Sequence, residues 1–235
     1  MELYEIMCTT SACREFTNDP LPDDVLFRIL DRARFAPSGG NRQGWRVIVV
    51  RDRGSREALA ALTVPAAKRY VAQVQAGENP WNTIDRPGVG GDVIEATQVP
   101  ARLIEPIRSA AVVLVLGLDL KVVASTDQHL DRVGVISGAS IYPFAWNILL
   151  AARHEGFGGT ITTLAVAQEP KVQELLGMPR HVAVAAVMPL GRPARRLTKL
   201  ARKPVPEFTM RERWGGPPLT SGASSGGVEA SRAPR

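Results

Sequence analysis

Three apolar, largely β-branched runs constrain the fold of this chain more than any other feature of its sequence. They are WRVIVV at residues 45–50, AAVVLVLGL at 110–118 and VAVAAVMPL at 182–190. Runs of this composition are typical of strands that are buried in a protein core. The sequence therefore predicts three buried strands in a sheet that lies between helices.

Helices are predicted before, between and after these strands. Residues 21–36 carry apolar side chains at the spacing of one helix face, begin with Pro22 and two aspartates, and end at a Pro-Ser-Gly-Gly sequence. Further helices are predicted at residues 1–18, 55–62, 133–154 and 168–176, and a glycine turn followed by a β-branched stretch is predicted at 156–164. This order of elements indicates one α/β-type domain.

Two segments differ from the rest in composition. Residues 76–100 are rich in glycine and proline, with Trp81 alone among polar neighbours, so they are predicted to form a long functional loop. Residues 215–235 have the composition of a disordered tail. We therefore expect a single domain over residues 1–214, with the 76–100 loop as an insertion.

The positive charge of the chain is concentrated in one segment. Residues 192–213 contain eight basic and two acidic residues, which accounts for the whole net charge of +6. Such a strip fits a small ligand with a phosphate as well as a polyanion. Phe208 is the only aromatic residue in it, whereas single-stranded nucleic acids are usually bound with interleaved aromatic side chains. We therefore expect no nucleic-acid partner.

The sequence favours a reduced, cytoplasmic location. Cys8 and Cys13 are too few for a disulfide scaffold, and no second Cys/His pair follows them at zinc-site spacing, so no metal is expected. The first residues include Glu2 and Glu5 and no apolar signal segment. Residues 133–152 carry no charge, but polar residues interrupt them, which favours a buried or interfacial helix over a membrane span.

Side chains alone do not indicate a catalytic mechanism. The three histidines have no metal-ligand partners at helical spacing, and neither a nucleophile elbow nor a phosphate loop is present. An enzyme of this sequence would therefore use a cofactor. Three places could hold one: Arg14, the segment PSGGNRQ at 37–43 and the segment GFGGT at 156–160. Each also has a simpler interpretation as a surface ion pair, a helix stop or a helix cap.

Taken together and in order, these segments resemble the FMN-dependent nitroreductase family, in its actinobacterial type, from about residue 4 to residue 214. The string APSGGNRQGW at 36–45 is the most specific match. The other matches are CTTSACREF at 8–16, LAA at 150–152 followed by GFG at 156–158, GRP at 191–193, and RKP at 202–204.

The resemblance implies an α+β fold with three layers (α/β/α), in which helices flank a central, mostly antiparallel sheet. It also implies an intertwined homodimer with FMN at the interface and with residues 133–154 packed across the two-fold axis. Arg14 would lie at the flavin, residues 37–39 would contact the FMN of the partner subunit, and Arg202 and Lys203 would bind the phosphate. The full set of expected cofactor-binding residues is Ser11, Arg14, Pro37, Ser38, Gly39, Asn41, Gly158, Gly159, Thr160, Arg202 and Lys203.

The activity that the resemblance implies is a ping-pong NAD(P)H oxidoreductase for nitroaromatic or quinone-like acceptors. The flavin N5 would carry the hydride near the backbone of Gly158 and Gly159, with no side-chain acid or base, and Trp81 would line the acceptor pocket. Thr10 and Ala12 stand where the family often has Arg and Ser. The acceptor therefore stays open, and the alternatives are a reductive dehalogenase, an enoyl-type reductase, a flavin-cleaving enzyme and a non-catalytic flavin- or nucleotide-binding regulator.

Overall fold

The computed structural model describes residues 2–221 and divides into two compact units. The first unit ends at Thr198, whereas the family resemblance extends to about residue 214. The second unit begins at Lys199, and its described part contains a short 3-10 helix, η5, at Val205–Glu207. The expected tail lies mostly outside the described residues, since only its residues 215–221 are included.

A four-stranded antiparallel sheet forms the centre of the first unit, in the order β1-β2-β4-β3. The strands are β1 (Trp45–Val50), β2 (Val112–Asp119), β4 (Val182–Gly191) and the very short β3 (Gly158–Gly159). Trp45 pairs with Leu118, and Val112 pairs with Leu190. The three predicted strands and the antiparallel sheet are therefore confirmed.

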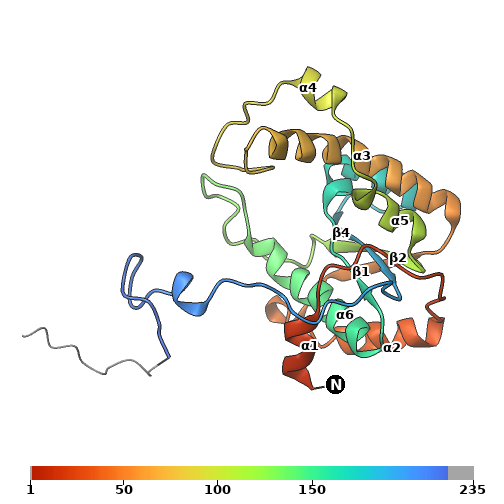
Figure 1. Cartoon of the computed structure of the whole chain (residues 1–235), viewed down its shortest axis with the longest axis horizontal. Helices are drawn as coiled ribbons and strands as arrows, with labels where there is room; N and C mark the ends of the chain where they lie inside the picture. The colour runs from red at the N-terminus through yellow and green to blue at the C-terminus, as the bar shows by residue number, and fades with distance from the viewer. Residues whose placement is uncertain (1, 222–235) are drawn as a thin grey trace, which may run out of the picture. The chain divides into compact units, whose positions relative to one another are not determined.

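Helices cover both faces of this sheet, which explains why its strands are mostly apolar (Figure 1). Alternate residues of a strand point to opposite faces. On β2, Val112 and Leu114 pack in the core formed with α2 (Asp23–Ala33) and α6 (Tyr142–His154). Val113 and Val115 pack in the opposite core, formed with α3 (Arg53–Gln75), α5 (Glu105–Ser109) and α7 (Glu169–Leu176). The result is the expected arrangement of three layers.

Helix α3 is longer than the sequence predicts. It was expected to end at residue 62 but continues through Pro65 to Gln75. A proline within a helix removes one backbone hydrogen bond. Buried residues on both sides of it, from Leu59 to Ala72, keep the two halves packed in one core. Packing therefore outweighs the local penalty.

Helix α6 is shorter than predicted. Residues 136–140 form a 3-10 helix, η3 (Ile136–Ser140), and the α-helix begins at Tyr142. Pro143 lies in the first turn of α6, where a proline has no hydrogen bond to lose, so it suits the beginning of a helix better than its middle. The uncharged residues 133–152 therefore contribute to two separate elements, η3 and α6.

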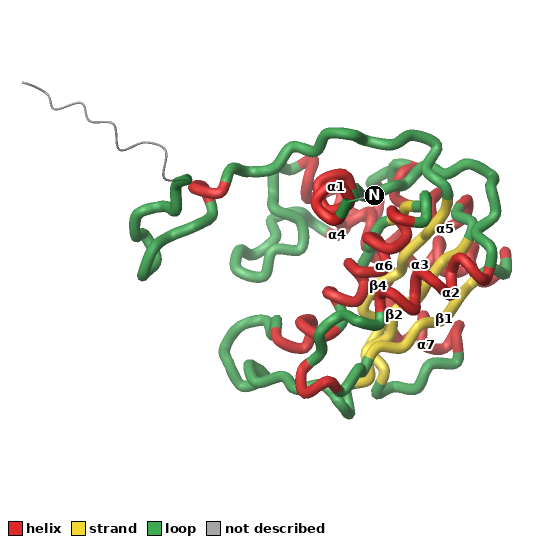
Figure 2. The backbone as a smooth tube through the Cα atoms, turned by 90° about the horizontal axis from the view of Figure 1, so that it is seen from below, coloured by secondary structure: helices red, strands yellow, loops and turns green. Residues whose placement is uncertain are grey.

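The remaining elements are short and lie at the edges of the domain. Helix α1 (Leu3–Thr9) covers only the first half of the predicted opening helix, and the 76–100 segment contains α4 (Gly91–Ala96). The tube in Figure 2 shows how much of the chain between the helices and strands is loop. The other 3-10 helices are η1 (Gly39–Asn41), η2 (Ala101–Leu103) and η4 (Leu164–Gln168).

Candidate functional site

Two adjoining cavities lie in the first unit. The smaller, about 250 Å³, is lined by residues 9–15, by Gly158 and Gly159, and by five arginines, and we call it the arginine cavity. The larger, about 620 Å³, is lined by Tyr70 and Trp81 together with mostly uncharged residues, and we call it the aromatic cavity. Arg14 and Arg102 line both cavities, which shows that the two cavities adjoin. The five arginines are Arg14, Arg102, Arg153, Arg195 and Arg196.

Backbone hydrogen bonds hold the opening segment against the edge of the sheet. The N–H of Cys13 donates to the carbonyl oxygen of Gly159 at 2.8 Å, and the N–H of Thr17 donates to that of Arg192 at 2.9 Å. The N–H of Ala194 donates back to Glu15 at 3.0 Å. Residues 9–15 are therefore fixed between β3 and the segment after β4, which places the arginine cavity at that edge.

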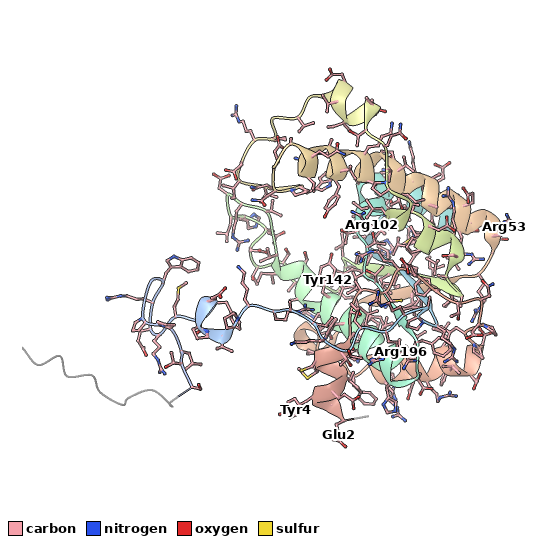
Figure 3. All side chains as sticks on the ribbon, viewed as in Figure 1. Glu2, Tyr4, Arg53, Arg102, Tyr142 and Arg196 are labelled. Atoms are coloured by element: carbon pink, nitrogen blue, oxygen red, sulfur yellow. The ribbon has the colours of Figure 1, made fainter. Side chains whose placement is uncertain are left out.

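The arginine cavity is strongly cationic. Arg153 donates to Oγ1 of Thr9, and Nη2 of Arg196 donates to the carbonyl oxygen of Gly156 at 2.6 Å. Within residues 2–221, the side chains of the other three arginines of the cavity form no hydrogen bond or salt bridge, and Glu15 is the only acidic residue of the lining. Figure 3 labels Arg102 and Arg196, which come from the turn before α5 and from the segment after β4. A cavity of this charge is suited to a phosphate or another anion.

The aromatic cavity is walled by a loop that side-chain contacts hold in place. The guanidinium of Arg69 lies over the Trp81 ring, 4.1 Å from its centre, and the N–H of Trp81 donates to Oε1 of Gln73 at 3.2 Å. Gln73 also donates to the carboxylate of Glu78, which accepts the N–H of Gly88 as well. These hydrogen bonds hold the pKa of Glu78 below its ordinary value. The beginning of the 76–100 segment is therefore an ordered wall.

The two glycines of β3 are required by packing. A Cβ atom on Gly159 would collide with the side chain of Leu190 and the carbonyl oxygen of Pro189. A Cβ atom on Gly158 would lie 3.0 Å from Cγ of Pro193 and 3.3 Å from Cβ of Cys13. The Leu190 side chain and the Pro189 backbone thus account for Gly159, and the side chains of Pro193 and Cys13 leave little room at Gly158, whereas the sequence suggested a flat surface for a ring.

Cys13 is the one ionisable thiol at the arginine cavity among the described residues. Its thiol donates to the carbonyl oxygen of Glu15 at 3.3 Å. Burial raises the pKa of Cys13 above its ordinary value, and the thiol is therefore neutral at pH 7.

The structure brings together six of the residues that the sequence singled out. Ser11, Arg14, Gly158 and Gly159 line the arginine cavity, and Arg14, Thr160 and Trp81 line the aromatic cavity.

The segment 37–41 lies outside the linings of both cavities. The N–H of Gln43 donates to Oγ of Ser38 at 3.0 Å, and the N–H of Gly39 donates to Oγ of Ser140 at 3.2 Å. These contacts join the segment to η3. The predicted phosphate ligands Arg202 and Lys203 belong to the second unit.

Sequence reasoning missed Arg102 and Arg153 as site residues. Arg102 lies in η2 and Arg153 near the end of α6, and neither stands in a recognisable motif. Arg195 and Arg196 belong to the basic strip, so their charge was noted but their place at the cavity was not. The fold alone brings these four arginines together, since they come from three separate segments.

The described residues contain neither a membrane-spanning helix nor a metal-binding cluster. None of their helices is long and apolar enough to span a membrane. No group of three or more His, Cys, Asp or Glu side chains within residues 2–221 is arranged to hold a metal ion.

A model described as "Nitroreductase family" matches residues 9–192. Iodotyrosine deiodinase 1 from Pongo abelii is 26% identical over 209 residues, which cover 88% of this chain and 67% of the deiodinase. An NADH dehydrogenase from Thermus thermophilus is 29% identical over 190 residues, which cover 77% of this chain and 82% of that protein.

The structure is also similar to that of an oxidized iodotyrosine deiodinase bound to FMN and 3-iodo-L-tyrosine. The TM-score is 0.63 at 19% identity, and the similarity covers 87% of this chain and 96% of the other. At this identity the likeness establishes the fold.

Proposed function

This chain belongs to the nitroreductase family, and we propose that it is an FMN-dependent NAD(P)H oxidoreductase that reduces nitroaromatic or quinone-like acceptors by a ping-pong mechanism. One observation carries the proposal. A cationic cavity adjoins a larger aromatic cavity at the segment 158–160. This pairing suits a cofactor with an anionic end and a planar ring.

The residues present fit FMN. Arg153, Arg195 and Arg196 line the arginine cavity alone and would hold the phosphate, together with the hydroxyl of Ser11. Arg14 and Thr160 line the aromatic cavity, where the ring would lie. From the family resemblance alone, we also propose that Arg202 and Lys203 bind the FMN phosphate.

When bound, FMN supplies the hydride-accepting and hydride-donating chemistry. The protein binds and orients the reactants, since within the described residues no side chain of either lining other than Cys13 and Glu15 is a thiol or a carboxylate. The Cys13 thiol is neutral and hydrogen-bonded, so it does not serve as a base. Tyr70 and Trp81 give a donor or acceptor ring an apolar contact surface that excludes water.

We propose that the enzyme is a homodimer. In the single chain, Tyr142 and Trp146 on α6 are 43% and 39% exposed, although the opposite side of this helix is buried in the core. Large exposed apolar residues on one helix face are typical of subunit interfaces. In such a dimer, residues 37–41 would reach the cofactor of the partner subunit, as the family resemblance implies.

Reductive dehalogenation is the second candidate, because a relative at 26% identity is an iodotyrosine deiodinase. The aromatic cavity would accept a halogenated ring by the same stacking. The two candidates use the same cofactor and differ in the bond that is reduced.

Anaerobic reduction of the purified protein tests the proposal. We expect visible flavin absorption that bleaches when NADPH or NADH is added, and that returns when a nitrofuran or menadione is added. Return of the absorption only with 3-iodo-L-tyrosine, together with release of iodide, would favour the dehalogenase. A protein that binds no FMN would refute both.

A further inference from the structure

We propose that Arg102 selects acceptors with an anionic group, so that the preferred substrate class is an electron-poor aromatic carboxylate. This inference rests on the proposed function, because it assigns the acceptor to the aromatic cavity. It adds a specificity-determining residue that neither the motifs nor the family comparison identified.

The position of Arg102 sets it apart from the other arginines. It lies in η2 (Ala101–Leu103), directly after the 76–100 segment that carries Trp81, and it lines both cavities. Arg153, Arg195 and Arg196 line only the arginine cavity. Arg14 also lines both, but it comes from the opening segment at the sheet edge, next to Gly159. Arg102 therefore reaches both cavities from the turn before α5.

The guanidinium of Arg102 is available for a ligand. The residue is exposed, and no hydrogen bond or salt bridge from its side chain is formed within the described part of the chain. An arginine without a partner keeps its paired N–H donors for a carboxylate, which it can bind with two parallel hydrogen bonds.

The rest of the aromatic cavity offers nothing to neutralise this cation. Among the described residues of its lining, the charged ones are Arg14 and Arg102, and none is acidic. The other residues are apolar, aromatic or hydroxyl-bearing, including Tyr70 and Trp81. Such a cavity favours a flat ring with a negative group and disfavours a cationic one.

Matched acceptors test the selection. The substrates are 4-nitrobenzoate and 4-nitrobenzamide, which share ring and nitro group and differ in the charge of one substituent. We expect the wild-type kcat/KM to be higher for the benzoate. Arg102→Gln should lower it about tenfold or more for the benzoate, through KM, and less than twofold for the benzamide. Arg102→Lys should recover part of the loss.

Arg86→Gln is the control, because Arg86 is exposed in the 76–100 segment that precedes η2 and lines neither cavity. This variant also removes one positive charge, and it should leave kcat/KM unchanged for both acceptors. The FMN dissociation constant, measured by flavin fluorescence, should be the same in Arg102→Gln and wild type. An equal loss for both acceptors, a wild type without preference, or weaker FMN binding in Arg102→Gln would overturn the proposal.

Calorimetric binding of benzoate and benzamide separates this inference from the proposed function, because it needs no turnover. Benzoate binding that depends on Arg102 would support the anion site even if NAD(P)H does not bleach the flavin. Benzoate binding equal in wild type and Arg102→Gln would refute the site, whatever the enzyme reduces.

Discussion

Arg153 on α6 donates from Nε and Nη2 to Oγ1 of Thr9, at 3.2 and 3.1 Å. The two residues are 144 positions apart in the sequence. The contact joins the end of α6 to the end of α1 and holds the guanidinium beside the arginine cavity. Arg153 therefore adds a cation from α6 beside the opening segment, whose own cation at this cavity is Arg14.

Arg153→Leu should weaken FMN binding. At the proposed phosphate site the change would remove a charge-assisted hydrogen bond, so we expect the FMN dissociation constant to rise about tenfold to a hundredfold. Titration of the apoprotein with FMN, followed by fluorescence quenching, measures this. Thr9→Val keeps the Arg153 guanidinium and removes only its hydrogen bonds to Oγ1 of Thr9. The rise in the FMN dissociation constant should therefore be smaller. Unchanged FMN affinity in Arg153→Leu would place the phosphate elsewhere.

Trp81→Ala should impair acceptor binding more than cofactor reduction. Loss of the stacking surface should raise the KM for an aromatic acceptor by roughly two- to tenfold. At saturating NAD(P)H the rate of flavin bleaching should change little, because the donor then fills the cavity despite the lost contact. Steady-state and stopped-flow kinetics separate the two. Ile84→Ala is the matched control, because Ile84 lies in the same segment, is 84% exposed and lines neither cavity.

Gly159→Ala should destabilise the fold. The added methyl group would collide with Leu190 and with the Pro189 backbone, which forces β3 and β4 apart at a cost of about 1–3 kcal/mol. We expect Tm to fall by several degrees in circular dichroism. Gly91→Ala should change Tm very little, since a Cβ at Gly91 meets nothing within 4 Å. Equal Tm values for the two variants would show that the sheet edge yields easily.

The Asp127 carboxylate should make stability depend on acid pH. It accepts the N–H of Val135 at 2.7 Å and Nη1 of Arg132 at 2.8 Å, and its side chain is 4% exposed. The Val135 N–H first, and then Arg132, lower the pKa of Asp127 from 3.8 to about 2. A lowered folded-state pKa gives stability that is present above pH 3.8 and is lost as the pH falls towards 2.

Asp127→Asn should therefore have a lower Tm than wild type at pH 7. The difference in Tm should shrink between pH 4 and pH 2, because the Asp127 carboxylate of the wild type becomes protonated there and its stabilising contribution is lost. Thermal melts at several pH values measure this. A difference that stays constant down to pH 2 would contradict the assignment.

Trp146→Lys should dissociate the proposed dimer. Trp146 is 39% exposed on the apolar outer face of α6, and a lysine there would place unpaired charges at the interface. Light scattering after gel filtration should give the mass of one chain, and bound FMN should be lost with the partner. Val74→Lys, on the exposed side of α3, should leave the mass unchanged.

The sheet was predictable because its central strands are buried on both faces. On β2, for example, Val112 and Val113 point to opposite faces and both are apolar. The ends of the helices were less predictable. Pro65 reads as a helix stop, yet buried alanines continue α3 beyond it. Pro143 was expected to interrupt the uncharged stretch, yet it lies in the first turn of α6, which begins at Tyr142. The local sequence does not tell whether a proline lies within a helix or in its first turn. The packing of the neighbouring residues decides between the two positions.

Short segments of the sequence encode the strands, the family motifs and two residues of the arginine cavity, Arg14 and Gly158, so these features were predictable. The tertiary structure alone decided that Arg102 and Arg153 join that site, and that Gly159 is required by Leu190. The physical reason is distance along the chain: a cavity is formed by residues from separate segments, and no local pattern records which side chains will meet.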